Sequence, residues 1–139
     1  MHLLDSDTLS HLWANHEHVV NRMRRCEDTE IGTTSITKCE VLRARCDNLL
    51  KAATPEDVVK AQQRLDRSEQ RLTELIVMPF DEAAGAELAR LEKVQKLSKI
   101  GHADLLIASV VLANDATLVT RNLKHFRQVP DLKLVNWVD

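Results

Sequence analysis

The sequence predicts an α/β fold in which a mostly parallel central sheet is flanked by helices. Short apolar runs with the composition of strands alternate along the chain with longer segments of helical periodicity. The 139 residues are 44% hydrophobic, with three glycines and three prolines, which is typical of a helix-rich globular chain. We therefore expect a single domain spanning residues 1–139.

The first predicted strand is residues 2–4, followed by a helical turn to about residue 14 and a second helix through residues 19–23. TEIGTTS, residues 29–35, is rich in β-branched residues and predicts the second strand. A helix is expected from about Ile36, because apolar side chains recur there at three- and four-residue spacings. These side chains are Ile36, Cys39, Leu42, Cys46, Leu49 and Leu50.

Another long helix is expected after Thr54-Pro55-Glu56-Asp57, which combines an N-cap residue, a first-turn proline and two acids. Its apolar stripe has a heptad-like spacing with charges elsewhere. The stripe consists of Val58, Ala61, Leu65, Ser68, Leu72 and Leu75. We interpret it as the core-facing side of an amphipathic helix, and a surface for a partner is the alternative.

The remaining elements complete the alternation. LIVMPF, residues 75–80, is a strand, and residues 81–96 are an amphipathic helix. Residues 104–113 form a helix that is apolar nearly all round and so belongs in the middle of the fold. ATLVT, residues 116–120, and LKLV, residues 132–135, are the last two strands. The carboxyl ends of such parallel strands share one rim, where ligands bind in this class of fold.

Composition limits the classes of function. The net charge is −2, with 19 basic and 21 acidic residues, so no global positive field attracts nucleic acid. Four aromatic side chains, Trp13, Phe80, Phe126 and Trp137, argue against an RNA-binding protein built as a stacking platform. An enzyme that grips phosphates through metal ions remains compatible, because the metal then supplies the positive charge.

The cysteines and the apolar runs indicate the environment of the chain. Cys26, Cys39 and Cys46 are odd in number and form no C-x-x-C pair, so we expect reduced, buried thiols rather than zinc ligands. No apolar run approaches 18 residues, and no basic segment followed by an apolar run opens the chain. We expect a soluble, cytoplasmic protein without a membrane partner.

Acidic side chains fall where the predicted rim lies. Asp5 follows the first strand, Glu40 lies in the helix after the second, and Asp104 begins the central helix. Each also has a structural interpretation. Asp5 could cap a helix, together with the neighbouring Ser6 or Asp7. Glu40 could complete a capping box with Thr37 or pair with Arg43, and Asp104 could be a first-turn acid.

Four segments taken in order, LLDSDTL, TSITKCEVL, IGHADLLIAS and LVTRNLKHF, closely resemble the PIN-domain family. The resemblance is strongest to the VapC ribonuclease toxins of type II toxin-antitoxin systems, and it runs from residue 3 to the terminal VNW. It implies a PIN-like three-layer fold and a metal-dependent endoribonuclease. The implied catalytic and metal-binding carboxylates are Asp5, Glu40 and Asp104.

The chain departs from the fullest family pattern at the fourth acidic position, which is Asn122. An amide oxygen still offers a ligand but no negative charge, so we expect one firm metal site and a second completed by substrate phosphate. Oxygen ligands suit Mg²⁺, with Mn²⁺ as a substitute. Ser6, Asp7 and Thr120 are expected to support the site.

Basic residues beside the motifs, Lys38, Arg121 and Lys124, are predicted phosphate contacts, and solvated charges are the alternative. His11, His16 and His18 receive no role. The resemblance further implies an RNA substrate, a cognate antitoxin and a homodimer.

Two other functions are compatible with parts of the sequence. A catalytically lapsed PIN-like interaction module would have Asn122 as its signature and the charged helix from Pro55 as its binding surface. DSDTL also resembles the opening motif of haloacid-dehalogenase-like phosphatases, in which the first aspartate is a nucleophile. One residue is missing from that motif between Asp7 and Thr8, and no later lysine and paired-aspartate motif follows.

Overall fold

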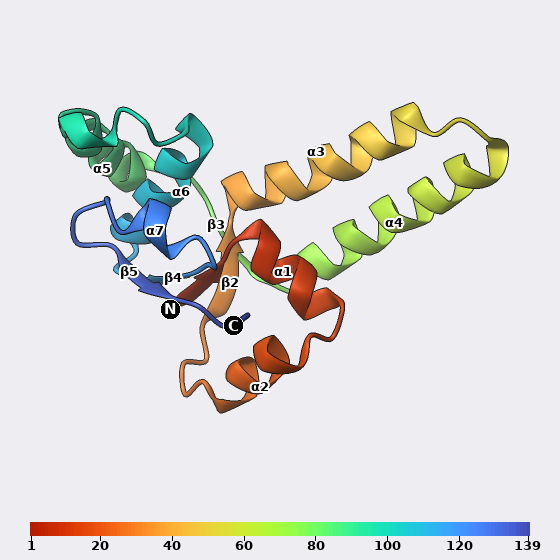
Figure 1. Ribbon diagram of the computed structural model, residues 1–139, viewed down its shortest axis with the longest axis horizontal. Helices are drawn as coiled ribbons and strands as arrows, with labels where there is room; N and C mark the ends of the chain where they lie inside the picture. The colour runs from red at the N-terminus through yellow and green to blue at the C-terminus, as the bar shows by residue number, and fades with distance from the viewer.

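The strands form one five-stranded sheet, seen in the computed structural model in Figure 1, which describes residues 1–139 except for the side chain of Lys96. Their order is β3-β2-β1-β4-β5, and every neighbouring pair is parallel. The predicted α/β fold with a mostly parallel sheet is confirmed, and the sheet is parallel throughout. The strands are β1 (His2–Leu4), β2 (Ile31–Thr34), β3 (Ile76–Met78), β4 (Thr117–Val119) and β5 (Lys133–Val135).

The helices lie where the sequence predicts them, with small differences at their ends. The helix expected at residues 81–96 ends at Glu92, and a short 3₁₀ turn follows. The central helix begins at His102 rather than at Asp104. The bounds are α1 (Ser6–Trp13), α2 (Glu17–Arg25), α3 (Ser35–Lys51), α4 (Pro55–Thr73), α5 (Glu82–Glu92), η1 (Gln95–Leu97), α6 (His102–Ala113) and α7 (Leu123–Phe126). The four-residue α7 was not predicted, because it is too short to show a periodicity.

Alternate side chains of the central strands enter two apolar cores, one on each face of the sheet. Leu3 of β1 and Leu118 of β4 pack in the core that contains the buried side chains of α5 and α6. Leu4 and Val119, the next residues along, pack in the core that contains residues of α1 and α2. Helices therefore cover both faces and make three layers, as the resemblance implies.

Helices α3 and α4 form an antiparallel hairpin that projects away from the sheet (Figure 1). On α4, Ala61, Ser68 and Leu72 are buried, whereas Val58 remains exposed. Leu72 reaches the core on the α1 and α2 face of the sheet. The core-facing interpretation of the α4 stripe thus holds for its C-terminal end, while the rest of the helix lies along the projecting hairpin.

The projection of α3 also overturns one expectation about the thiols. All three cysteines are free, as predicted, but Cys39 and Cys46 are exposed on α3, and Cys26 is partly buried. The prediction of buried thiols was wrong for Cys39 and Cys46, because α3 projects from the sheet in the hairpin with α4 (Figure 1). Among the described residues, no helix combines the length and the apolar character that a membrane span needs.

Candidate functional site

The carboxyl ends of β1 and β4 are held together at one rim of the sheet. The backbone N–H of Asp5 donates a hydrogen bond of 3.1 Å to the Val119 carbonyl oxygen. Thr8, which is buried, also donates to that oxygen through Oγ1 at 3.2 Å. On the neighbouring strand, Thr33 Oγ1 donates to the Leu4 carbonyl oxygen at 2.6 Å. Buried hydroxyls thus fix the backbone on which Asp5 sits.

Asp5 is the N-cap residue of α1. Its Oδ1 accepts a hydrogen bond of 2.8 Å from the backbone N–H of Thr8. The cap interpretation is therefore confirmed. Because the cap uses one carboxylate oxygen, a cap and a ligand role are compatible for Asp5.

Glu40 lies in the second turn of α3. This helix is capped by Thr34, whose Oγ1 accepts a hydrogen bond of 3.0 Å from the Thr37 backbone N–H. The capping-box interpretation of Glu40 is wrong, because it requires Thr37 as the N-cap residue, whereas the N-cap is Thr34, three residues earlier. Among the described residues, no basic side chain lies within ion-pair distance of Glu40, and the suggested pair with Arg43 is absent.

Three carboxylates share one electrostatic environment at the rim. Partial burial raises the pKa of Glu40 above its ordinary value, and the negative charges of Asp104 and Asp5 raise it further. Side chains separated by up to 99 positions in sequence are thus close enough to repel one another. Asp5, Glu40 and Asp104 therefore lie near one another at this rim, while their catalytic and metal-binding roles stay predictions.

Asp104 has a partner that sequence reasoning missed. Asp104 lies in the first turn of α6, which confirms the interpretation as a first-turn acid. Its Oδ2 is 2.9 Å from His125 Nε2. That nitrogen is buried, and among the described residues it has no hydrogen-bond partner. The sequence offered one signal for this contact: His125 lies in the motif LVTRNLKHF, three residues after Asn122, the predicted fourth ligand.

The segment after β4 is arranged differently from the three carboxylates. Thr120 is buried, and its Oγ1 accepts a hydrogen bond of 3.0 Å from the Asn122 backbone N–H. Asn122 is exposed, and its side chain makes no cap bond to α7. Thr120 thus supports the turn, while the metal-binding role of Asn122 stays a prediction.

The predicted phosphate contacts differ in their availability. Arg121 donates to both carboxylate oxygens of Asp139, at 3.3 and 3.2 Å, so its guanidinium is already engaged. Lys38 and Lys124 are exposed, and neither takes part in an ion pair among the described residues. Their assignment as phosphate contacts stays a prediction.

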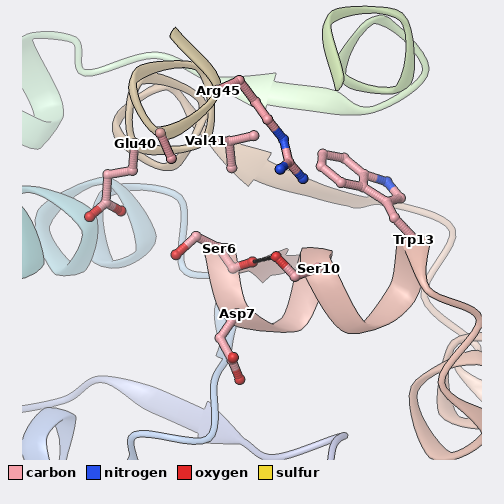
Figure 2. Close-up of a pocket in the computed structure, with 8 residues that line it drawn as sticks. Ser6, Asp7, Ser10, Trp13, Glu40, Val41 and Arg45 are labelled. Carbon is pink, nitrogen blue, oxygen red and sulfur yellow. Dashed lines mark hydrogen bonds between the residues drawn. The ribbon is translucent and has the colours of Figure 1, made fainter. Parts of the chain in front are cut away.

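A pocket of about 360 Å³ opens between α1 and α3 beside Glu40 (Figure 2). The Ser6 carbonyl oxygen accepts a hydrogen bond of 3.0 Å from Ser10 Oγ at its floor. Asp7 is half-exposed and directed away from Ser6, and its Oδ2 lies 3.6 Å from His11 Nδ1. Asp7 therefore stands beside the site rather than at its centre.

The donor types at the rim suit a hard cation. Carboxylate oxygens are the ligands that Mg²⁺ prefers, and Mg²⁺ usually retains several waters and takes one or two carboxylates directly. Among the described residues, no three His, Cys, Asp or Glu side chains are grouped closely enough to hold an ion by themselves. The arrangement thus fits a hydrated cation better than a closed cage of protein ligands. His11, His16 and His18, whose rings lie edge to face, form no such group either.

The fold and the site place this chain in the class of parallel α/β proteins, which bind their ligands at the carboxyl ends of the strands. Within that class, residues 3–132 match the PIN domain family, and the chain belongs to this family.

The chain is also similar to individual proteins. It is 54% identical to Ribonuclease VapC2 of Rickettsia felis over 48 residues, which are 34% of this chain and 36% of that protein. The fold matches VapBC-1 from nontypeable Haemophilus influenzae, with a TM-score of 0.80, 21% identity and coverage of 99% and 98% of the two chains. It also matches VapBC2 from Rickettsia felis bound to a promoter DNA fragment, with a TM-score of 0.76, 28% identity and 98% of each chain covered.

Proposed function

We propose that this chain is a metal-dependent endoribonuclease and the toxin of a toxin-antitoxin pair. The observation that carries the proposal is the meeting of Asp5, Glu40 and Asp104 at one rim of a PIN-domain sheet. The resemblance of the four sequence motifs to VapC toxins and the partial identity to a VapC ribonuclease support the same substrate class.

Each carboxylate has a defined task in this proposal. Asp5, whose carboxylate is fixed by its cap bond, would hold a hydrated Mg²⁺ or Mn²⁺ together with the nearby Glu40 and Asp104. When bound, such a cation lowers the pKa of water and stabilises negative charge that develops on phosphate. His125 lies beside the Asp104 carboxylate, and Lys38 and Lys124 neutralise flanking phosphates.

Asn122 sets the number of cations in the proposal. Its amide offers an oxygen without a charge, so one cation is held by the three carboxylates and a second is completed by the substrate phosphate. Mg²⁺ is the proposed cofactor, and Mn²⁺ substitutes for it.

The proposed partners follow from the resemblance. Solved relatives include VapBC2 from Rickettsia felis and a toxin-antitoxin complex from Klebsiella pneumoniae. We assign this chain a cognate antitoxin that blocks the rim, a homodimeric state and a cytoplasmic location. A lapsed interaction module is disfavoured by the three carboxylates, and a haloacid-dehalogenase-like phosphatase by the PIN match over residues 3–132.

The test is cleavage of a mixed RNA pool by the purified protein with Mg²⁺, with Mn²⁺ and with EDTA. The expected result is metal-dependent cutting that Asp5→Asn lowers by roughly 10²-fold or more, because one charged group of the site is lost. The variant also controls for a contaminating nuclease. Cutting that persists in EDTA, or in the purified variant at the wild-type rate, would contradict the proposal.

A further inference from the structure

The pocket beside Glu40 does not end at the carboxylates. Ser6, Ser10 and Trp13 of α1 line one side, and Glu40 and Arg45 of α3 lie on the other. Figure 2 shows the Arg45 side chain extending toward the Trp13 ring, away from Glu40. One end of the pocket is therefore acidic and catalytic, and the other end offers a cation and an aromatic ring.

Arg45 also lines a second pocket, of about 370 Å³, between α3 and α4. Lys60 and Arg64 of α4 line this pocket with it, together with one acid, Asp57. The two pockets therefore meet at the Arg45 side chain. Glu40, Ala44, Asn48 and Ala52 line the two pockets at four-residue steps, which place them on one face of α3.

We define the hairpin track as this face of α3 from Glu40 to Ala52 together with the side chains that border it. Twelve helical residues span about 18 Å, a length that several successive phosphates of a nucleic acid strand can cover. The track begins at the carboxylates and continues away from them, so a strand bound at the rim can follow it.

The cations of the track are available for an anion. Arg45 Nε donates a hydrogen bond of 3.1 Å to Ser68 Oγ, which anchors the side chain across the hairpin. Among the described residues, Arg45, Lys60 and Arg64 take part in no ion pair. The positive charge lies in the second pocket, which these three cations line against one acid, Asp57, whereas the first pocket also contains Asp7 and Glu40.

Trp13 adds a surface for a base. The ring lines the first pocket and is partly exposed, whereas the other tryptophan, Trp137, is buried. Bases stack on aromatic side chains with little dependence on sequence, and cations beside the ring follow the backbone. This combination suits single-stranded RNA better than an apolar peptide.

We infer that the hairpin track binds the single-stranded RNA that flanks the scissile bond, with Arg45, Lys60 and Arg64 on phosphates and Trp13 stacked on a base. The inference rests on the proposed endoribonuclease function and adds a binding site that lies beyond the three carboxylates.

The first experiment measures binding of a fluorescent single-stranded RNA by anisotropy at several salt concentrations. It uses Asp5→Asn protein, in which the proposed cleavage is lost. Adding Lys60→Gln and Arg64→Gln should weaken binding and reduce the slope of log K against log salt by about 1.4, since each single-strand phosphate contact contributes about 0.7. The matched control is Arg24→Gln with Lys93→Gln. It also removes two exposed positive charges, but Arg24 lies on α2 and Lys93 at the end of α5, outside the hairpin track.

The second experiment uses tryptophan fluorescence. RNA should quench the emission of Asp5→Asn protein, and Trp13→Phe should abolish the quenching, because Trp137 is buried against His2. An unchanged salt slope in the Lys60 and Arg64 variant, or equal loss in the control, overturns the hairpin track, as does quenching that survives Trp13→Phe. RNA cleavage by the wild-type protein, measured in parallel, then separates this failure from failure of the proposed function.

Discussion

Asp5 carries two roles that a substitution can separate. Asparagine caps a helix about as well as aspartate, so Asp5→Asn should keep the bond to the Thr8 N–H while it removes the charge. We predict a melting temperature near that of the wild type but no stabilisation by Mn²⁺. Asp5→Ala should in addition lose about 1 kcal/mol of stability. Thermal melts with and without Mn²⁺ measure both effects, and equal Mn²⁺ stabilisation of Asp5→Asn and wild type would count against a ligand role.

Glu40 gives the pH dependence. Its pKa is raised above the ordinary 4.5, so the folded protein holds this proton more tightly than the unfolded chain. The stability of the metal-free protein therefore falls as pH rises through the window above about 4.5. Glu40→Gln removes this penalty, and it is a cleaner test than Asp104→Asn, which would also break the contact with His125.

We predict that metal-free Glu40→Gln is more stable than the wild type at about pH 7, by less than about 1 kcal/mol because the side chain is partly solvated. At about pH 4 the difference should disappear, since both proteins are then neutral at this position. Melting temperatures in EDTA at the two pH values measure the effect. A variant that is less stable at neutral pH would show that the three carboxylates do not repel one another.

At the residue scale, the sequence predicts a site residue when the place of that residue relative to a strand or helix fixes its place in the fold. Strand and helix signals placed Asp5, Glu40 and Asp104 at the predicted rim, and the resemblance to the PIN-domain family selected them as site residues. His125 could not be predicted, because its contact with Asp104 depends on how the short α7 turns back from β4. The availability of Arg121 was equally hidden, since its partner Asp139 lies 18 positions away.

At the scale of elements, the parallel pairing of β2 with β3 depends on a glycine. A Cβ placed on Gly32 would lie 2.1 Å from the Ile76 carbonyl oxygen, so the strands could not keep their pairing. We predict that Gly32→Ala destabilises the protein by about 1 to 3 kcal/mol or more. Gly85→Ala on α5 is the matched control, because the added methyl has room there and a helical glycine costs about 0.5 to 1 kcal/mol relative to alanine.

Denaturant unfolding of the two variants tests this element. Loss of stability in Gly32→Ala with a neutral or stabilising effect of Gly85→Ala is the expected pair of results. If Gly32→Ala were as stable as the wild type, the close approach of β2 and β3 would be in error.

Periodicity predicted the elements well and their packing less well. The strands and long helices fall within a few residues of their predicted bounds, because alternation of apolar and polar residues reports which segments are half-buried. The same pattern cannot say what a helix packs against. The apolar residues of α3 thus suggested buried thiols, although Cys39 and Cys46 lie on a projecting hairpin.

At the scale of the whole molecule, the proposed homodimer is testable by light scattering. Among the exposed large apolar residues, the exposed fraction is 83% for Leu50, 56% for Val59 and 41% for Ile76. Because exposed apolar side chains that are scattered singly are normal on a monomer, the resemblance to VapC toxins carries the prediction of a dimer. We predict a mass of twice the chain's 15.8 kDa at micromolar concentration, and a mass of one chain would contradict the dimer.

The central claim is that one cation site made by Asp5, Glu40 and Asp104 supports RNA cleavage, and Mn²⁺ binding is its most direct measurement. Free Mn²⁺ can be followed by electron paramagnetic resonance in titrations of the wild type, Asp5→Asn, Glu40→Gln and Asp104→Asn, with Glu92→Gln as an exposed control. We predict that the wild type and Glu92→Gln bind Mn²⁺ equally and that each of the other three variants binds it far more weakly. Wild-type affinity in a folded variant of any of these three carboxylates would contradict the account.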